Sequence, residues 1–380
     1  MTISLDDLRR FAVGRNFPKP TTLKRALHRI GFVQADPIRA PARAQDLILR
    51  HRVENYHAGD LERRYSSLDI EEDFFVNYGF VTRTVHGLMH PRSDSRVPAD
   101  DIDSPWSAAQ EKSAKLVLEF VRGRGIVHPR EVDEYFAHGK VKNYWGGSSN
   151  ATTHLLDAMH YRGFLRVVRR EKGIRVYAAK EPWQSQIRES GREPEGIGVA
   201  ERCQRIDALV DLAVRIYAPL PAPSLAYYVR RLRYAAPQWR QELPEALRRA
   251  KERLAGARLE GCDWYWPKDE SPKKQAIGDK VRLLAPFDPL VHDRTRFELL
   301  WNWSYRFEAY TPAVKRKMGY YAMPLLWRDQ VIGWGNLSTP AGQLEADFGY
   351  IASRPPRALS FKRALEEELE RLRLFLSSST

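Results

Sequence analysis

The segment between residues 106 and 180 restricts the fold more than any other part of the sequence. An amphipathic helix pattern that ends at Gly125 precedes a short apolar run, and a second helix pattern begins after Pro129. A third helix pattern follows the capping residues at 148–150, and two alternating strands then flank a Glu-Lys-Gly turn at 171–173. Helix, strand, helix, helix and hairpin is the order of a winged helix-turn-helix unit. We therefore predict one such unit across residues 101–185.

The predicted hairpin is unusually basic. A small α+β packing module needs the same apolar core, but it does not need four basic residues on and beside the hairpin, which are Arg166, Arg169, Arg170 and Lys172. We predict that these side chains contact DNA. His154, on the preceding helix, is a further candidate for a phosphate contact, although a lone histidine on a helix is more often a surface residue.

Two similar units and a different C-terminal region complete the predicted organisation. Residues 1–100 contain helix patterns after Ser4 and Thr22, a strand pattern at 32–38 and a helix pattern at 42–55, which fit a winged-helix-like unit with its wing reduced or displaced. Residues 198–268 contain three helix patterns and a closing strand, and residues 281–380 contain aromatic-rich strands and a charged final helix. The predicted fold class is α+β, with tandem winged helix-turn-helix units around a basic cleft and a C-terminal β-rich segment.

Charge indicates the kind of partner. The chain has 62 Lys and Arg against 48 Asp and Glu, a formal net charge of +14, which favours a polyanion as its ligand. The alternative is a surface on which Arg simply replaces Lys. Two cysteines are too few for a disulfide framework or a zinc site, and no apolar run approaches the roughly 20 residues of a membrane span. We expect a cytoplasmic, nucleoid-associated monomer that binds double-stranded DNA, without a membrane, metal or cofactor.

Two motifs carry a family resemblance. Gly31-Phe-Val-Gln-Ala-Asp-Pro-Ile38 is followed by an arginine-rich helix pattern that ends near Tyr56, and the second motif is Leu284-Ala-Pro-Phe-Asp-Pro-Leu-Val-His-Asp-Arg294. In order and spacing the chain resembles the crosslink-repair DNA glycosylases of the YcaQ and AlkZ type, from the first strand to about residue 335. That resemblance implies a run of winged-helix units and a Gln-hydrophobic-Asp signature at Gln34, Ala35 and Asp36. The chain departs from the family at Ala35, which is usually bulky, and at residues 78–94, where the family tends to have a His-Glu-Ala segment.

The signature suits hydrolysis of an N-glycosidic bond. The reaction passes through a sugar with oxocarbenium character, which a carboxylate stabilises while an amide positions the attacking water. Positions i and i+2 of a strand face the same side, so Gln34 and Asp36 can serve one pocket as the catalytic pair. The alternative is that Asp36 only forms an Asp-Pro turn and that Gln34 faces solvent.

Other residues of the two motifs are candidates for contact with DNA. We predict that three arginines after the signature contact DNA, namely Arg43, Arg50 and Arg52. We also predict that four residues of the second motif form a second wall of the cleft, namely Asp288, His292, Asp293 and Arg294. An Asp-Pro turn with a histidine nearby explains the second motif equally well. The predicted function is a monofunctional glycosylase for alkylated purines, with a range that extends to interstrand crosslinks. The alternative is a non-enzymatic winged-helix DNA-binding protein or transcriptional regulator.

Overall fold

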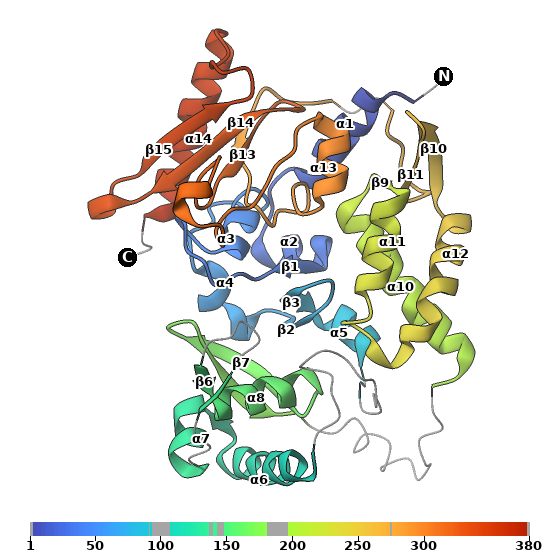
Figure 1. The fold of residues 1–380 in the computed structure, drawn as a ribbon, viewed down its shortest axis with the longest axis vertical. Helices are drawn as coiled ribbons and strands as arrows, with labels where there is room; N and C mark the ends of the chain where they lie inside the picture. Colours follow the sequence, from blue (N-terminus) through green and yellow to red (C-terminus); the bar gives the residue numbers. More distant parts are fainter. Residues whose placement is uncertain are drawn as a thin grey trace. The chain divides into compact units, whose positions relative to one another are not determined.

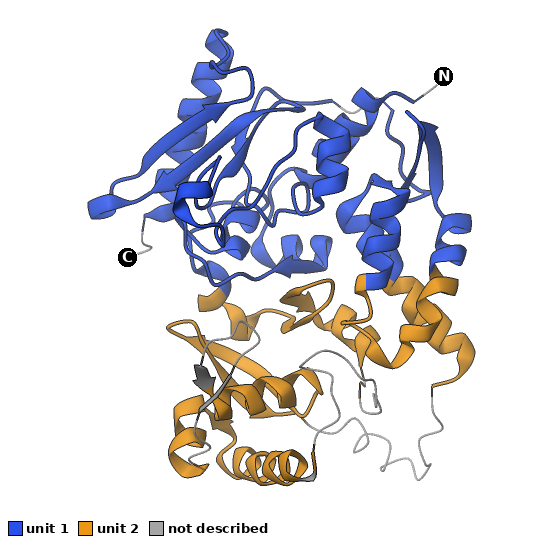
Figure 2. Cartoon of the chain, in the orientation of Figure 1, with its two compact units in different colours: residues 1–61, 210–230, 247–380 blue, residues 62–209, 231–246 orange. Residues whose placement is uncertain are grey.

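The structure, a computed structural model, describes residues 3–90, 92, 107–136, 140–142, 148–180, 197–273 and 276–377. The chain forms two compact units (Figure 2). Unit 1 comprises Met1–Leu61, Val210–Arg230 and Leu247–Thr380, and unit 2 comprises Glu62–Leu209 and Arg231–Ala246. These units group segments that lie far apart in sequence, so the predicted divisions at 1–100, 101–185, 198–268 and 281–380 stay predictions. No helix in the described ranges is long and apolar enough to cross a membrane.

Unit 1 begins with two capped helices (Figure 1), as the sequence predicts. Ser4 and Asp7 form a capping box on α1, and Thr22 caps α2, which ends where Gly31 adopts φ 75°. The next two elements are shorter than predicted. The predicted strand ends at Gln34, and the predicted helix over 42–55 ends at Leu49, after which the backbones of Arg52 and Glu54 hydrogen bond to Thr21. The elements are α1 Leu5–Asn16, α2 Leu23–Ile30, β1 Phe32–Gln34, α3 Ala44–Leu49 and α4 Asp60–Arg63.

Unit 2 contains the element order predicted for residues 106–180. Ser107 and Asn150 cap α6 and α8, and the hairpin turns through Lys172 and Gly173, which have φ of 49° and 87°. Its three strands form an antiparallel sheet in the order β4-β8-β7 around a core of Val117, Leu156 and other aliphatic side chains. The elements are α6 Ala108–Arg124, β4 Ile126–Val127, α7 Pro129–Phe136, β5 Lys140–Lys142, β6 Ser148–Asn150, α8 Ala151–Tyr161, β7 Leu165–Glu171 and β8 Ile174–Ala179.

The same order of elements recurs between residues 199 and 266. Here too the strand before the second helix pairs with the last strand of the hairpin, in the sheet order β10-β11-β9. The predicted single closing strand is wrong, because Glu260 and Gly261 reverse the chain with φ of 49° and 79° and make a hairpin. The elements are α10 Val199–Tyr217, β9 Leu220–Pro221, α11 Ala222–Arg231, η2 Pro237–Glu242, α12 Leu243–Arg253, β10 Ala255–Leu259 and β11 Cys262–Trp266.

The order helix, strand, helix, helix, strand, strand is also present along residues 23–82. It is completed by an antiparallel hairpin that the sequence analysis did not predict, formed by β2 Ile70–Phe74 and β3 Tyr78–Thr82. Helix α5 Arg83–Met89 follows, capped by Thr82. This chain order therefore occurs three times, and over residues 106–180 the strands β5 and β6 are added to it.

The C-terminal part of unit 1 is a four-stranded antiparallel sheet in the order β12-β13-β14-β15. The final helix α14 is fixed to the edge strand, because the buried Glu368 carboxylate accepts a hydrogen bond of 2.8 Å from the Leu283 backbone N–H. Helix α13, which was not predicted, begins at the Asp293 cap. The elements are β12 Val281–Leu283, α13 Arg294–Trp301, η3 Ala313–Lys315, β13 Met323–Trp327, β14 Gln330–Ser338, η4 Pro340–Gly342, β15 Glu345–Tyr350 and α14 Leu359–Leu376.

Candidate functional site

The predicted catalytic pair lies at the end of β1. Gln34 is its last residue and is 9% exposed, whereas Asp36 lies beyond the strand and is half-buried. The Asp36 carboxylate accepts a hydrogen bond of 2.9 Å from the Ile38 backbone N–H, which makes the Asp-Pro turn that the sequence offered as an alternative. On α3, the buried Gln45 accepts a hydrogen bond from the Asp36 N–H at 3.4 Å. The turn and a functional carboxylate are therefore compatible, because the second carboxylate oxygen is not used by the turn.

Burial changes the acidity of Asp36. The loss of hydration raises the pKa of the carboxyl, and the Ile38 N–H offsets part of that rise. Two phenols lie within range of its charge: after burial, Asp36 is the next cause of the raised pKa of both Tyr310 and Tyr321. Tyr321 is 3% exposed, and its hydroxyl has no hydrogen-bond partner in the described part of the chain. A carboxyl whose proton affinity is raised therefore lies within electrostatic range of a buried hydroxyl that has no partner in the described ranges.

Arg294 extends this site from the second motif. Its guanidinium donates hydrogen bonds to the backbone oxygens of Val291 at 2.7 Å and Pro286 at 3.0 Å, and it lies over the Tyr305 ring at 4.4 Å. Burial lowers the pKa of Arg294, and its positive charge opposes the rise in the pKa of Tyr321. The second motif therefore supplies the positive charge of Arg294, which acts on the pKa of Tyr321 in the opposite direction to the charge of Asp36.

The other three residues of the predicted wall have different positions. Asp288 is 0% exposed, so the prediction that it lines a cleft is wrong. It accepts two hydrogen bonds from Arg52, at 2.8 and 3.1 Å. Asp293 is 7% exposed and caps α13, whereas the half-buried His292 lies 2.9 Å from the Tyr228 hydroxyl through Nδ1. Of the four residues predicted to form the second wall of the cleft, only His292 and Arg294 therefore remain candidates.

Comparison with known proteins shows the family. A family model described as DNA glycosylase AlkZ-like matches residues 27–375, a range that includes both motifs. The chain belongs to this AlkZ-like family. Among solved structures, Streptomyces sahachiroi DNA glycosylase AlkZ has the same fold, with a TM-score of 0.61 and 15% identity over 99% of this chain and 97% of that chain. The resemblance predicted from the sequence is confirmed, and the family assigns the chain a DNA glycosylase role with DNA as its partner.

Two of the three arginines predicted to bind DNA after the AlkZ-like signature lie in the interior. The side chain of Arg50 is 3% exposed and pairs with Glu368 at 2.6 Å, and that of Arg52 is 5% exposed and pairs with Asp288. The prediction that these two contact phosphate is wrong, because guanidinium groups enclosed by protein cannot reach a DNA backbone. Arg43, half-buried at the start of α3, stays a candidate.

Among the basic residues of the unit 2 hairpin, some also form ion pairs within the protein whereas others are exposed. Arg170 donates hydrogen bonds to the fully buried Glu72 at 2.8 and 2.6 Å, and Arg166 donates one to Glu71 at 2.9 Å. These arginines hold the hairpin against β2, so the prediction for Arg170, only 13% exposed, is corrected to a structural role. Arg169 and Lys172 are exposed and stay candidates for phosphate contacts, as does the exposed His154 on α8.

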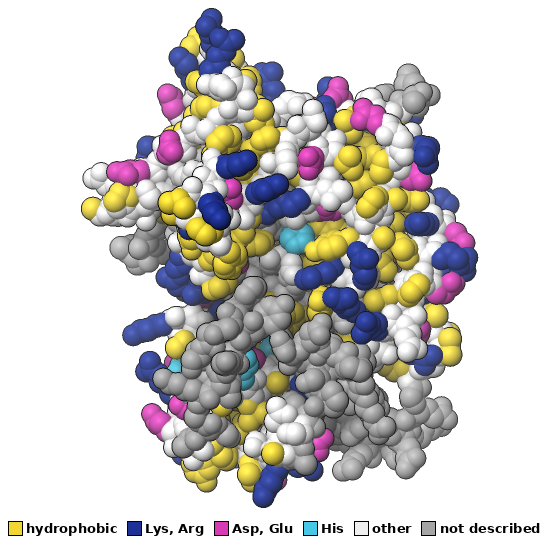
Figure 3. Space-filling view, viewed as in Figure 1, with side chains coloured by type: hydrophobic (Ala, Val, Ile, Leu, Met, Phe, Trp, Pro, Cys, Tyr) yellow, Lys and Arg dark blue, Asp and Glu magenta, His cyan; other side chains and the backbone are white. Residues whose placement is uncertain are grey.

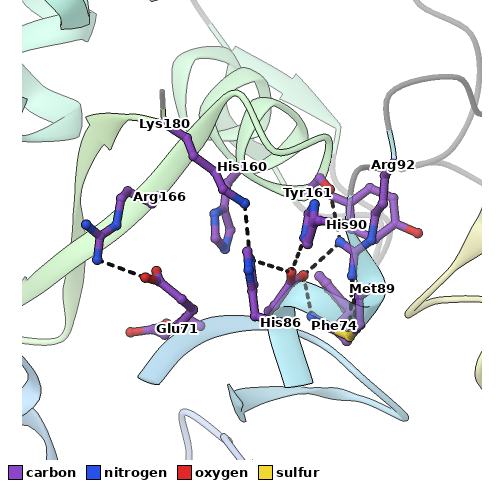
Figure 4. A network of polar contacts seen from close by, with 12 residues as sticks. Glu71, Phe74, His86, Met89, His90, Arg92, His160, Tyr161, Arg166 and Lys180 are labelled. Atoms are coloured by element: carbon purple, nitrogen blue, oxygen red, sulfur yellow. Dashed lines mark hydrogen bonds and ion pairs between the residues drawn. The ribbon is translucent and has the colours of Figure 1, made fainter. Parts of the chain in front are cut away.

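Unit 2 also contains a buried polar network (Figure 4), in part of the 78–94 segment that departs from the family. Asp73 accepts hydrogen bonds from His90 and Arg92, each at 2.8 Å, and His86 lies 3.4 Å from the same carboxylate. Two histidines and an aspartate are a ligand set that zinc uses, whereas the sequence predicts no metal. However, Arg92 occupies one carboxylate oxygen and Lys180 lies 3.5 Å from His86, so two cations oppose a metal ion there.

The network therefore reads better as a structural anchor. Burial opposes ionisation of Asp73, but the charge of Arg92 and the hydrogen bond from His90 outweigh it and hold its pKa well below the usual range. Burial and the charge of Arg92 lower the pKa of His90 to about 4, so the imidazole is neutral at neutral pH. Residues 91, 93 and 94 of the departing segment lie outside the described residues.

Sequence reasoning missed Tyr310, Tyr321 and their relation to Asp36. Both tyrosines come from the segment before β13, about 280 residues after the signature in the sequence. The family resemblance, which extends to about residue 335, covers this region, but it did not indicate which side chain lies within range of the Asp36 charge.

Proposed function

We propose that this chain hydrolyses the N-glycosidic bond of alkylated purines in double-stranded DNA. The observation that carries the proposal is the half-buried Asp36 carboxyl, whose charge reaches the buried Tyr321 hydroxyl, a group with no hydrogen-bond partner among the described residues. A water molecule attacks C1′ of the sugar, the bond from C1′ to the purine nitrogen breaks, and its electron pair neutralises the alkylated base. Asp36 stabilises the cationic sugar and accepts the proton of the water, while Gln34 orients that water.

We also propose a monofunctional reaction. Among the described residues, the groups seen to hydrogen bond to Asp36 or to respond to its charge are a backbone N–H, the Gln45 amide and two phenols. None of these is an amine that could replace water as the nucleophile. The proposal includes interstrand crosslinks, because a half-exposed catalytic carboxyl after a short strand does not require the base to enter a deep pocket.

The repeated element order supports winged-helix modules as the DNA-binding framework. In residues 106–180 and 199–266, the first strand pairs with the last strand of a hairpin that follows the helices in sequence. This is the arrangement expected of a winged helix. We propose a tandem of such modules acting as a monomer.

The experiment is a base-release assay. The protein is incubated with a duplex that contains 7-methylguanine and with a crosslinked duplex, and released base is measured by chromatography. Release of 7-methylguanine from the duplex, with no strand cleavage, is the expected result. Absence of release, together with sequence-selective binding by a dimer, would instead favour a transcriptional regulator.

A further inference from the structure

Loop 309–320, between α13 and β13 in unit 1, exposes apolar side chains. Val314 is 94% exposed, Tyr310 is 73% exposed and Tyr320 is 44% exposed. Figure 3 shows hydrophobic side chains, with Lys and Arg among them, where Figure 1 draws the orange helical turn beside β13. Single exposed apolar residues are common on protein surfaces, but three within eleven residues indicate a surface that binds something.

The described hydrogen bonds fix the shape of this loop. The buried carboxylate of Glu308 accepts backbone N–H bonds from Lys317 at 2.9 Å, Met318 at 2.7 Å and Gly319 at 3.3 Å. On the other side of the loop, Asn336 donates a hydrogen bond of 2.7 Å to the Met318 oxygen. Gly319 has φ 122°, and a Cβ there would lie 2.2 Å from the Asn336 side chain, so both strain and space require glycine. The exposed side chains are therefore presented by a fixed backbone.

Charge indicates what the loop binds. Residues 309–320 contain three basic residues, Lys315, Arg316 and Lys317, and no acidic residue. The two lysines are exposed, and the Arg316 guanidinium lies 5.0 Å from the centre of the Tyr320 ring. Aromatic side chains interspersed with basic ones suit nucleic acid, because rings stack on bases while cations bind phosphates.

The loop lies within electrostatic range of the proposed catalytic carboxyl. The Phe307 ring lies between those of Tyr310 and Tyr321, at centroid distances of 6.1 and 5.4 Å. Both tyrosines respond to the charge of Asp36. Because the loop lies within range of the Asp36 charge and Tyr310 is 73% exposed, a nucleotide with its sugar at Asp36 would lie near this loop.

We infer that loop 309–320 is a wedge that opens the base stack of duplex DNA next to the nucleotide at Asp36. Tyr310 and Val314 contact the faces of the separated bases, and Lys315 and Lys317 bind the adjacent phosphates. Apolar wedges that unstack a base step are a general means of deforming a duplex. This inference rests on the proposed function for the position of the damaged nucleotide, but the opening of the stack can be measured without any base release.

The test uses the full chain and a duplex with 2-aminopurine beside a 7-methylguanine, whose fluorescence rises when the probe base loses stacking. We expect wild-type protein to raise the fluorescence, and Tyr310→Ala and Val314→Ser to reduce that rise and weaken binding by roughly five- to a hundredfold. Tyr310→Phe keeps the ring and should behave as wild type. Leu374→Ala, at an equally apolar position on α14 that is 59% exposed, is the matched control. Thermal unfolding should not change, because the substituted side chains are exposed.

Each outcome decides between the two proposals. A fluorescence rise that depends on Tyr310, without base release by wild-type protein, supports the wedge and refutes the proposed reaction. Base release that is equal in wild type, Tyr310→Ala and Val314→Ser, with the same fluorescence in all three, refutes the wedge and leaves the reaction in place. Binding by wild type without any rise in fluorescence also refutes the wedge.

Discussion

The charge of Asp36 acts on the Tyr321 hydroxyl, which is buried and has no hydrogen-bond partner in the described part of the chain. Leaving such a hydroxyl unpaired destabilises a folded protein by about 1–3 kcal/mol. A group of this kind is tolerated where a ligand or a water molecule completes its hydrogen bonds. The relationship between these two residues therefore indicates where the attacking water or the substrate lies.

Tyr321→Phe separates a catalytic role of this hydroxyl from a structural one. Removing an unpaired buried hydroxyl should leave the free energy of unfolding unchanged or raise it by about 1 kcal/mol. Base release from a 7-methylguanine duplex should fall by about tenfold, as expected for loss of one hydrogen bond to the reacting groups. Urea unfolding and single-turnover base release are the measurements. A variant that is less stable, with an unchanged rate, would show that the hydroxyl has a structural partner instead.

Asp36→Asn removes the proposed charge while keeping the shape of the side chain. Loss of one well-placed electrostatic contact or proton acceptor slows a reaction by about 10²–10⁴-fold, and we expect base release to fall by that order. DNA affinity should stay level or rise slightly, because a negative charge leaves the site. Gln34→Ala should slow release by less, since an amide orients water without carrying charge.

The control for both variants is thermal unfolding, measured beside single-turnover release. A purely structural role for the Asp-Pro turn predicts lower melting temperatures and weaker DNA binding along with lower activity. Base release by Asp36→Asn at the wild-type rate would show that Asp36 is not catalytic.

The raised pKa of Asp36 predicts how activity depends on pH. The carboxyl must be ionised to stabilise the sugar cation, so activity falls as pH falls through its pKa. Because burial raises that pKa, the loss should begin at higher pH than an ordinary aspartate, with a pKa of about 3.9, would give. Stability should also decline at low pH, because the buried neutral His90, with a pKa lowered to about 4, opposes the uptake of a proton that an unfolded histidine accepts below about pH 6.5, so the folded fraction must be followed at each pH. The rate of base release, corrected for spontaneous depurination, and circular dichroism are measured over one pH series.

The Arg52–Asp288 pair should matter for stability and not for binding of phosphate. Removing one partner leaves a buried charge without compensation, so Arg52→Met or Asp288→Leu should lower the free energy of unfolding by about 3–5 kcal/mol. The double variant should recover much of this loss, because it removes both charges. Urea unfolding of the three variants tests the expectation. If Arg52→Met folds normally and only weakens DNA binding, Arg52 binds DNA after all.

Two adjacent arginines of the unit 2 hairpin should behave differently. Arg169 is exposed, so Arg169→Ala should weaken binding similarly on every duplex sequence and reduce the salt dependence by about 0.9 in the log–log slope. Arg170 pairs with the buried Glu72, so Arg170→Ala should instead lower stability, by about 1–3 kcal/mol. Binding is titrated against salt concentration, and unfolding is followed by circular dichroism. Equal salt slopes for wild type and Arg169→Ala would remove this residue from the DNA contacts.

Local patterns predicted most of the fold. The helix caps at Ser4, Thr22 and Asn150 are where the sequence places them, because capping depends on residues within one turn. The β2–β3 hairpin was missed, since its strand carries three consecutive buried acids, Glu71, Glu72 and Asp73, in place of apolar residues. Those acids are stabilised there by ion pairs with Arg166, Arg170 and Arg92, which no pattern within the strand reveals.

The site was predictable to a smaller extent. The signature located Gln34 and Asp36. However, no sequence periodicity could reveal that Arg52 forms a buried ion pair with Asp288, or that the charge of Asp36 raises the pKa of Tyr321. Both relationships join residues more than 230 positions apart. The sequence shows that a residue is basic, but only the fold shows whether its side chain is exposed to solvent, can contact DNA or pairs with a buried acid.

The Arg50–Glu368 contact has a consequence for how the protein is made. These partners are 318 residues apart, and Glu368 also fixes the edge of the C-terminal sheet at Leu283. Chains fold from the N-terminus during synthesis, and contacts between distant residues form late. In a ribosome-bound chain that has not yet produced α14, Arg50 therefore lacks its partner Glu368. The region around Gln34 and Asp36 should become stable only once translation has passed residue 368, so incomplete chains should be inactive and readily degraded.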